Sequence, residues 1–438
     1  MTEFARLVIF EEIMNLDTSE IFTNIQLIGI PLKLKLRNKD MNFLFILNTF
    51  YPNIGGVENA TYEICKRLKE RGHEIFVLTT TKVNVRPNNQ DLPFFEKIDG
   101  IRIYRIRHAL RFFDIPWKAL YLARKYQIDY VYITDFWGGV ALFLKKIFRI
   151  PFVYVLNGYN PICPRGTLFH EQACQGFEVW KCLEQCHKFS FRFLFTLIIT
   201  RMLLLEAEPV IAISEAVRDA YRAYFGKISM KLLYYGVDAQ KFKPLPVQPS
   251  TLTHNLEDSD KILLFFGRLI KERGVAEFLP HFKEILKQVE CKLLIVGSGP
   301  EIKEIKEEAN SLSLQKKVIF TGFLRNKDLV NVINISTLVI LPILFPEPLS
   351  LVALEAMACG KPVISFELGG VKELLAHDKV GLLIAPNNWK EFTNKIHQIL
   401  SNEELSESIG SAARQRVEKF FTWKKFVDQF LKVIIQNR

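Results

Sequence analysis

Short runs of β-branched and aromatic residues alternate with amphipathic segments along most of the chain. From Met41 onward, NFLFIL is followed by VENATYEICKRLKERG, whose apolar residues recur at helical spacing up to Gly72, and then by EIFVLTT. The alternation continues through DYVYIT, a helical segment that contains Leu142 and Phe148, and FVYVL. Helices that separate buried strands are typical of βαβ units, so the pattern predicts an α/β fold with a doubly wound parallel sheet.

A second series of the same kind begins after KPLPVQPSTLTHN, a stretch rich in Pro, Ser, Thr and Asn. Its predicted strands are KILLFFG, CKLLIVG, VIFTG, TLVILP, KPVISF and GLLIAP. We therefore expect an N-terminal domain over residues 41–243, a linker over 244–259 and a C-terminal domain over 260–418. Residues 1–40 fit neither series and are interpreted as an extension outside the fold. Two such Rossmann-like sheets would face each other across a cleft at their strand ends, where ligands bind.

Composition and charge narrow the classes of partner. The 438 residues are 49% hydrophobic and 24% charged, the balance of a folded protein, and the net charge of +11 suits anionic partners. Between Gly100 and Ile150 there are ten Lys or Arg and three Asp, with aromatic residues among them. No zinc-finger or RNA-binding motif accompanies this region, so a nucleic acid is not the expected partner. An anionic membrane surface and a merely solvated basic face both fit.

The most apolar segment is too short and too charged to span a membrane. It runs from Phe189 to Leu205 and is interrupted by Arg192 and Arg201. A buried helix and a helix that lies in the membrane interface are the two interpretations. The first residues do not have the pattern of a secretory signal. We therefore expect a cytoplasmic protein, peripheral on the inner face of the cell membrane if it binds membranes.

Candidate chemistry is densest in EPLSLVALEAMACGKPVISFELGGVKE, residues 347–373. Pro348 fixes the backbone after Glu347, and Ser350 can cap a helix that runs to Gly360. The start of such a helix favours a phosphate or another anion. Glu347 could then accept hydrogen bonds from sugar hydroxyls, and Glu355, about a turn and a half further on, from a second set. The alternative interpretation is that both acids are ordinary surface or capping residues.

Other strand ends add cations and glycines. Arg268 directly follows the strand KILLFFG, and Lys271 and Arg273 follow a few residues later, where cations could stabilise a diphosphate leaving group. Gly55 and Gly56 lie between a strand and a helix, where glycine permits a close approach to a ligand or simply a tight turn. The sequence LLIVGSGPE is an incomplete dinucleotide motif and carries little weight.

Four cysteines lie close together in the N-terminal half. Cys163, Cys174, Cys182 and Cys186 fall within an insertion near residues 160–190 and could hold a structural zinc ion. Their spacing does not contain the paired C-x-x-C of many zinc sites, and buried free thiols are the alternative.

Seven segments, in order, resemble the successive motifs of the retaining glycosyltransferases of GT-B fold, which include glycosyltransferase family 4 and glycosyl transferases group 1. They are YPNIGGVENATYEICKRLKERGHEIFVLTT, AISEAVRDAY, YYGVDAQKFKP, FFGRLIKERGV, LLIVGSGPE, VIFTGFL and EPLSLVALEAMACGKPVIS with GGVKELL. The resemblance implies a nucleotide-sugar-dependent hexosyltransferase that needs no metal or other cofactor and retains the anomeric configuration. It also implies that a helix over residues 419–438 crosses back to the N-terminal domain.

The resemblance further implies roles for single residues. Glu347 would hold the donor sugar, the backbone of Leu349, Ser350 and Leu351 would touch the sugar and phosphates, and Glu355 would bind the ribose. Arg268 and Arg273 would neutralise the diphosphate, and Gly56, next to Gly55, would shape the loop that meets it from the other domain. The acceptor would be a glycan or a lipid-linked sugar of the cell envelope.

Five positions depart from the family pattern. Arg273 stands where Lys is usual, Ser350 where Gly is usual, and Tyr235 where Asn is usual. Asn157 and Gly158 stand where His and often Asp are found, and Asn cannot take up a proton at neutral pH. Asn157 is therefore a candidate catalytic residue that replaces the usual His. This departure motivates a second hypothesis, a nucleotide-sugar-binding protein with weakened or lost catalysis. A nucleotide-sugar epimerase on the same plan is disfavoured, because the complete Glu347 to Glu355 motif is typical of the transferases.

Overall fold

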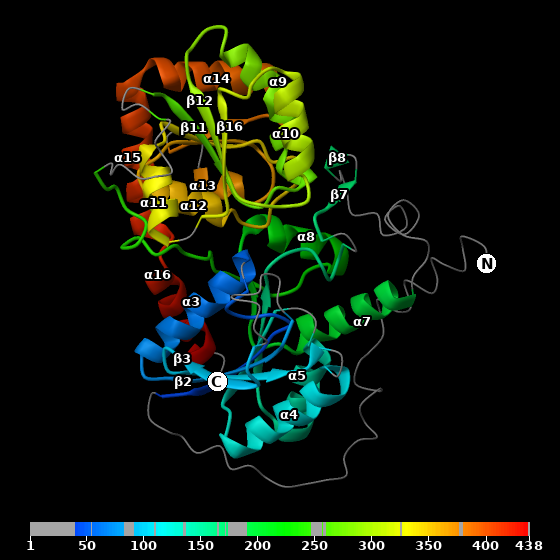
Figure 1. Cartoon of the computed structure of the whole chain (residues 1–438). Helices are drawn as coiled ribbons and strands as arrows, with labels where there is room; N and C mark the ends of the chain where they lie inside the picture. The colour runs from blue at the N-terminus through cyan, green and yellow to red at the C-terminus, as the bar shows by residue number, and fades with distance from the viewer. Residues whose placement is uncertain are drawn as a thin grey trace, which may run out of the picture.

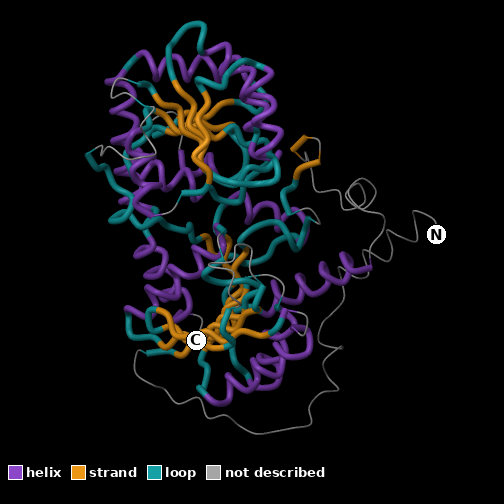
Figure 2. The backbone as a smooth tube through the Cα atoms, viewed as in Figure 1, coloured by secondary structure: helices purple, strands orange, loops and turns teal. Residues whose placement is uncertain are grey.

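The chain forms two lobes, each built around one sheet with helices on both faces (Figure 2). The computed structural model describes residues 40–53, 55–82, 92–108, 111–134, 137–163, 166–170, 172–173, 191–246, 256, 260–324, 326–375 and 380–436. The predicted extension, apart from Asp40, and most of the predicted linker lie outside these residues. No helix of the described residues has the length and apolar character needed to cross a bilayer.

The N-terminal sheet has eight strands in the order β10-β9-β6-β5-β1-β2-β4-β3. Every neighbouring pair is parallel except β3 and β4. The strands are β1 (Asn42–Ile46), β2 (Glu74–Thr80), β3 (Phe95–Ile98), β4 (Ile101–Ile106), β5 (Tyr130–Ile133), β6 (Phe152–Leu156), β9 (Val210–Ala212) and β10 (Lys231–Leu232). The antiparallel edge arises because Asp99 and Gly100 both have positive φ, as a two-residue hairpin turn requires.

The C-terminal sheet has six strands, all parallel, in the order β13-β12-β11-β14-β15-β16. They are β11 (Ile262–Phe266), β12 (Lys292–Val296), β13 (Val318–Gly322), β14 (Leu338–Leu341), β15 (Val363–Phe366) and β16 (Leu382–Ile384). These are the six strands that the apolar runs predicted. The prediction of two doubly wound parallel-sheet domains is thus confirmed.

Helices cover both sheets (Figure 1). Those of the N-terminal lobe are α3 (Gly56–Glu70), α4 (Arg111–Lys125), α5 (Gly138–Phe148), α7 (Phe191–Glu206) and α8 (Glu215–Phe225). Two short antiparallel strands, β7 (Phe169–His170) and β8 (Gln172–Ala173), form a separate small sheet. Those of the C-terminal lobe are the 3-10 turn η4 (Lys271–Arg273), α9 (Val275–Ile285), α10 (Ile302–Ser311), α11 (Asn326–Ile335), α12 (Leu351–Ala358), α13 (Val371–Leu375), α14 (Trp389–Ser401) and α15 (Glu403–Phe420).

Alternate side chains of each strand enter different cores. In β11, Leu263 and Phe265 pack with Phe278 of α9 on one face of the sheet. Leu264 and Phe266 belong to the core of the opposite face, which contains Ala353 and Leu354 of α12. Because both faces are buried, the strand has no polar alternation and reads as a continuous apolar run.

The last helix, α16 (Trp423–Gln436), returns to the N-terminal lobe and lies beside α3 (Figure 1). Its apolar stripe, which includes Trp423, Phe426 and Phe430, is buried. The Phe430 ring lies 6.3 Å from that of Phe43 on β1. The C-terminal end of the chain therefore ties the two lobes together.

In each sheet the strand order reverses once. The N-terminal sheet grows from β1 toward β4 on one side and from β5 toward β10 on the other, and the C-terminal sheet does the same from β11 and β14. Loops that leave the carboxyl ends of the two strands at such a reversal diverge and leave room for a ligand. The loops after β11 and β14 contain Arg268, Arg273 and Glu347, so the fold itself directs attention to them.

Candidate active site

The loops that follow β11 and β14 are packed directly on each other. The Leu344 N–H donates to the Glu272 carbonyl at 2.9 Å. Gly274 has a φ of +68°, and a Cβ atom at this position would lie 2.0 Å from the Pro342 carbonyl oxygen. Glycine is required here both by the left-handed backbone and by the lack of space. This contact brings the end of η4 next to the segment that leads into α12.

A buried ion pair joins these two loops. Nη2 of Arg273 lies 2.5 Å from Oε1 of Glu347, and both side chains are largely buried. Glu347 Oε2 and Arg273 Nε and Nη1 are also buried, and within the described part of the chain they have no hydrogen-bond partner. Buried polar atoms without partners cost free energy, so a polar ligand that reached these three atoms would relieve that cost.

Helix α12 begins at Leu351, four residues after Glu347. The Ser350 hydroxyl accepts a hydrogen bond from the Ala353 N–H at 3.4 Å, and its carbonyl accepts one from the Leu354 N–H at 3.2 Å. Ser350 therefore caps the helix as the sequence predicted. The N–H groups of Leu351 and Val352 have no acceptor among the described residues. They remain available to an anion at the positive end of the helix.

A pair of glycines supports Glu347 from behind. Gly369 has a φ of +66°, and a Cβ there would lie 2.3 Å from the Glu347 carbonyl oxygen. The Gly370 N–H donates to that oxygen at 2.8 Å, and a Cβ on Gly370 would lie 2.2 Å from the Pro348 carbonyl. The loop after β15 thus holds the loop after β14 by backbone contact. This explains why a double glycine follows the apolar run that ends at Phe366.

The N-terminal lobe meets the same region with small residues. A Cβ on Gly56 would be 3.6 Å from Leu351 Cδ1, and one on Gly158 would be 3.6 Å from Pro348 Cγ. Gly55 is extended, with φ −176°, which any residue can adopt. Its conformation therefore does not require glycine. Of the two glycines, Gly56 is the one that lies opposite the start of α12.

Asn157 follows β6 and is held by Tyr235, which is another departure from the family pattern on this lobe. The Tyr235 hydroxyl donates to Asn157 Oδ1, while Nδ2 is buried without a partner among the described residues. Tyr235 is itself buried, and its ring packs against Trp423 and Phe426 of α16. The sequence identified both residues but gave no indication that they form a pair.

Glu355 and Arg268 differ in environment. Burial raises the pKa of Glu355 to about 7, and the positive charge of Lys241 opposes this shift. Arg268 is exposed, and within the described residues its guanidinium makes no hydrogen bond or ion pair. The adjacent Gly267 lies against Val352 of α12, where an added Cβ would be 3.8 Å from Cγ2. Neither side chain bonds to the Glu347 carboxylate, and among the described residues Arg273 is the side chain that does.

One residue that sequence reasoning left without a role links the two lobes. The carboxylate of Glu373, at the start of α13, accepts hydrogen bonds from the Glu215 N–H at 2.7 Å and the Ala216 N–H at 2.9 Å. These are the first N–H groups of α8, whose N-cap is Ser214. A carboxylate is favoured at a helix N-terminus, and here it comes from the other lobe. Nothing in the local sequence pattern could have predicted a partner 157 or 158 residues away.

Most of the predicted cysteine site lies outside the residues that the structure describes. Cys174, Cys182 and Cys186 lie outside the described residues. Cys163 is buried and is not in a disulfide. Within the described ranges no three residues with metal-binding side chains gather at one point. The zinc hypothesis therefore stays a prediction.

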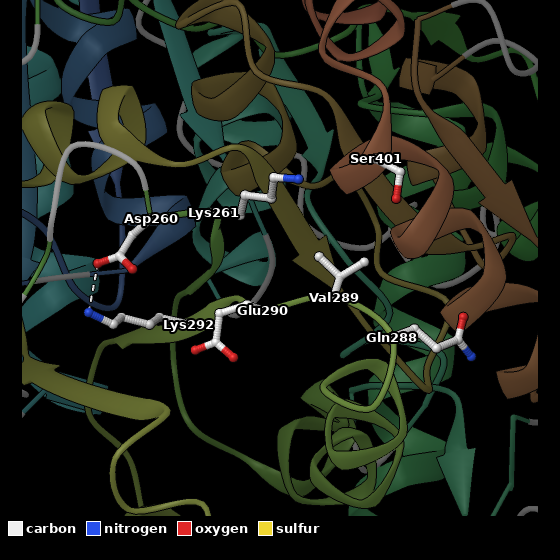
Figure 3. Close-up of a pocket in the computed structure, with 7 residues that line it drawn as sticks. All are labelled: Asp260, Lys261, Gln288, Val289, Glu290, Lys292 and Ser401. Carbon is white, nitrogen blue, oxygen red and sulfur yellow. Dashed lines mark hydrogen bonds and ion pairs between the residues drawn. The ribbon is translucent and has the colours of Figure 1, made fainter.

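The C-terminal lobe also has a pocket, and Figure 3 shows the residues that line it. Asp260 and Lys261 immediately precede β11, and Lys292 begins β12, so the pocket opens at the amino ends of these strands. Lys292 and Asp260 already neutralise each other, with 2.6 Å between Nζ and Oδ2. The pocket is at the amino ends of the strands, whereas Glu347 follows the carboxyl end of β14, so the pocket is not part of the candidate site.

Comparisons with known proteins agree on one family. A model of Glycosyltransferase Family 4 matches residues 54–241, and a model of Glycosyl transferases group 1 matches residues 252–416. The chain is 25% identical over 391 residues to N-acetyl-alpha-D-glucosaminyl L-malate synthase of Bacillus anthracis, which covers 87% of this chain and 94% of that protein. It is 25% identical over 355 residues to alpha-monoglucosyldiacylglycerol synthase of Streptococcus pneumoniae, with coverages of 77% and 73%.

A solved structure confirms the predicted fold type. HepE of Anabaena, crystallised with UDP, is similar with a TM-score of 0.71 at 23% identity, and the match covers 90% of this chain and all of that one. The arrangement of two parallel-sheet lobes is thus the GT-B fold.

Proposed function

The chain belongs to the glycosyltransferases that join a Glycosyltransferase Family 4 domain to a Glycosyl transferases group 1 domain, and on this premise we propose that it transfers a sugar from a nucleoside-diphosphate sugar to an acceptor hydroxyl with retention of configuration. The observation that carries the proposal is the buried Arg273–Glu347 pair beside the start of α12, with its open polar atoms.

Each polar group of the site that has no partner can be matched with a part of the nucleotide-sugar donor. Oε2 of Glu347 can accept hydrogen bonds from hydroxyls of the donor sugar. The N–H groups of Leu351 and Val352, with Arg268 and Arg273, can hold the diphosphate, whose negative charge grows as it leaves. Glu355, further along α12, is assigned to the ribose hydroxyls. Support from relatives is that HepE was crystallised with UDP.

The chemical step that we propose proceeds on one face of the sugar. The bond between the anomeric carbon and the phosphate oxygen breaks, and the acceptor oxygen bonds to that carbon from the same side. The acceptor proton passes to the departing phosphate oxygen. In this proposal no carboxylate attacks the anomeric carbon, and Glu347, paired with Arg273, is assigned to binding the donor sugar. The protein therefore acts mainly by positioning the donor and stabilising the developing negative charge.

The acceptor that we propose is a glycan or lipid-linked sugar of the cell envelope, handled at the inner face of the membrane. Its support is a relative, the alpha-monoglucosyldiacylglycerol synthase, whose name indicates a glycolipid product.

A product analysis tests the reaction. The purified chain is incubated with a panel of nucleoside-diphosphate sugars and a membrane-lipid extract, with and without EDTA, and products are identified by mass spectrometry. Nuclear magnetic resonance then gives the anomeric configuration of the product.

We expect a glycosylated product with the anomeric configuration of the donor, and we expect it to form also in the presence of EDTA. An inverted product would reject the retaining mechanism. Donor binding without any turnover would favour the alternative, a binding protein that has lost catalysis because Asn157 cannot take up a proton.

The Tyr235–Asn157 pair allows a first prediction about catalysis. Replacing Tyr235 with Phe removes the hydroxyl that donates to Oδ1 of Asn157. The Asn157 amide can then rotate, so its Nδ2 group no longer has a fixed direction. We expect kcat to fall about tenfold, with a smaller change in the donor KM, because an interaction of about 1.4 kcal/mol in the transition state would be lost.

The matched control is Tyr130→Phe. Tyr130 is also buried on the N-terminal lobe, and its hydroxyl donates to the Glu208 carbonyl at 2.8 Å. Both variants lose a buried hydrogen bond, so similar melting temperatures are expected for the two. If Tyr130→Phe lowered kcat as much as Tyr235→Phe, the positioning role would be refuted.

Glu355 leads to a pH prediction. Its pKa of about 7 means that the carboxyl of the empty enzyme is protonated below pH 7 and ionised above it. If ribose hydroxyls bind the ionised form, donor affinity should rise by up to about tenfold per pH unit toward pH 7 and level off above it. Calorimetric titrations with the nucleotide at several pH values from about 5.5 to about 8.5, on both sides of that pKa, measure the affinity. Glu355→Gln should bind more weakly and lose the dependence, whereas a wild-type profile as flat as that of the variant would contradict the assignment.

A further inference from the structure

Helix α4 carries apolar side chains on two opposite faces. Ile115, Ala119, Leu122 and Ala123 are buried against the N-terminal lobe. Phe113, Trp117 and Tyr121 follow one another at four-residue spacing and are 76%, 73% and 47% exposed. At about 100° per residue, these three rings lie on the side of the helix opposite to the buried residues. Core packing therefore explains one face and not the other.

The exposed rings belong to a larger surface. We call Phe113, Trp117 and Tyr121 the α4 aromatic face; Phe112, which lies at a different angle around the helix, is also exposed, at 54%. Exposed rings also occur on two elements next to α4, namely Phe95 at the start of β3 and Phe143 on α5. The Phe95 ring lies 5.0 Å from that of Tyr104, over which Lys118 of α4 lies at 5.4 Å. Exposed aromatic clusters of this size on a folded protein mark interaction sites.

Ring contacts connect these parts. The Arg124 guanidinium lies 5.0 Å from the Phe148 ring, which in turn is 6.3 Å from the Phe143 ring on the same helix. The α4 aromatic face is thus continuous with the exposed edge of α5, and Figure 1 shows the two helices together on one side of the N-terminal sheet.

The charges around the rings are almost all positive. Helix α4 contributes Arg111, Lys118, Arg124 and Lys125, against a single acid, Asp114. Lys118 Nζ lies 4.9 Å from the centre of the Tyr121 ring, and Lys125 Nζ donates to the Tyr121 hydroxyl at 2.9 Å. Within the described residues, none of the four cations forms an ion pair with a carboxylate. By contrast, Lys145 and Lys146 of α5 are paired with Glu206 and Glu208.

We propose that the α4 aromatic face docks on the surface of an anionic lipid bilayer, with α4 parallel to the membrane plane. Aromatic rings with polar ends are favoured at the level of the lipid headgroups, and unpaired lysine and arginine side chains are attracted by lipid phosphates. A symmetric dimer through the same face would bring the four cations of one α4 against those of the other, which is unfavourable. The lipid surface is therefore the occupant that both the rings and the charges fit. This inference does not rest on the proposed reaction, because docking requires neither donor nor acceptor.

Co-sedimentation with vesicles tests the proposal. The full chain is mixed with vesicles of phosphatidylcholine alone or of equal parts phosphatidylcholine and phosphatidylglycerol. We expect binding to the anionic vesicles only, weakened by salt. The double variant Phe113→Ser/Trp117→Ser should bind at least about tenfold more weakly, because both rings lose their apolar contact with lipid. Lys118→Glu should weaken binding more than about fivefold, because attraction of one charge becomes repulsion.

Matched controls lie outside the α4 aromatic face. Ile435→Ser removes a side chain that is 61% exposed on α16, and Lys303→Glu reverses an exposed charge on α10; both should bind vesicles as the wild type does. Circular dichroism and transfer to a water-soluble acceptor should be unchanged in all variants, which separates docking from folding and from catalysis. Equal binding to neutral and anionic vesicles, or wild-type binding by the double variant, would overturn the proposal. A wild-type dimer that becomes monomeric in the double variant, without lipid binding, would identify a second copy as the occupant instead.

Discussion

Replacing Glu347 with Gln is expected to lower sugar transfer by about a thousandfold, as the loss of one preorganised electrostatic contact at a reacting centre does. The amide is neutral and presents an NH₂ group where a carboxylate oxygen stood. It can neither match the charge of Arg273 nor accept hydrogen bonds at both of its ends. Initial rates of product formation at saturating donor measure the effect.

Two further variants separate chemistry from folding. Glu367→Gln changes an exposed carboxylate that directly follows β15, two residues before Gly369. This variant should leave transfer unchanged. Arg273→Lys keeps the charge opposite Glu347 and should retain much more activity than Glu347→Gln, since it has the residue type usual in the family. A Glu347→Gln enzyme that is folded, judged by its thermal transition, and within about twofold of wild-type turnover would refute the role of Glu347.

Replacing Gly369 with Ala is expected to cost about 3 kcal/mol or more of unfolding free energy. The new Cβ would demand a left-handed conformation that disfavours non-glycine residues, and it would also lie 2.3 Å from the Glu347 carbonyl oxygen and 2.5 Å from the Pro346 carbonyl carbon. Both obstacles are backbone atoms, so no side chain can move aside. The loop that holds Glu347 must shift instead, and transfer activity should fall with stability.

The chain offers a close control for this experiment. Gly322 has a similar φ of +74°, but nothing lies within 4 Å of a Cβ placed there. Gly322→Ala therefore carries the conformational cost alone, about 1–2 kcal/mol. The difference between the two variants in denaturant unfolding isolates the backbone clash. Equal losses of stability would show that the loop after β15 adapts freely, and the support that we ascribe to Gly369 would then be wrong.

These two predictions concern one structural unit. Glu347 is held from the front by Arg273 and from behind by the double glycine, and each support comes from a different strand end. A functional side chain fixed from several elements keeps its geometry when a ligand enters.

Much of this could be predicted from the sequence. All six strands of the C-terminal sheet were recognisable, because strands buried on both faces are continuous apolar runs such as ILLFF. The N-cap role of Ser350 was also recognisable, because a cap depends on the three residues that follow it. The edge strand β3 was missed, since FEKI alternates exposed and half-buried residues and has no apolar run.

The sequence by itself determined the order of helices and strands, and with it which polar residues follow which strand, because hydrophobic periodicity reports burial over a few residues. Only the tertiary structure decided which of these residues meet. Arg273 and Glu347 are 74 positions apart, Tyr235 and Asn157 are 78 apart, and Glu373 reaches α8 in the other lobe. The reason is physical: such contacts depend on where the strand order reverses, on backbone turns that only glycine permits, and on the packing of two lobes, and no local pattern records any of these.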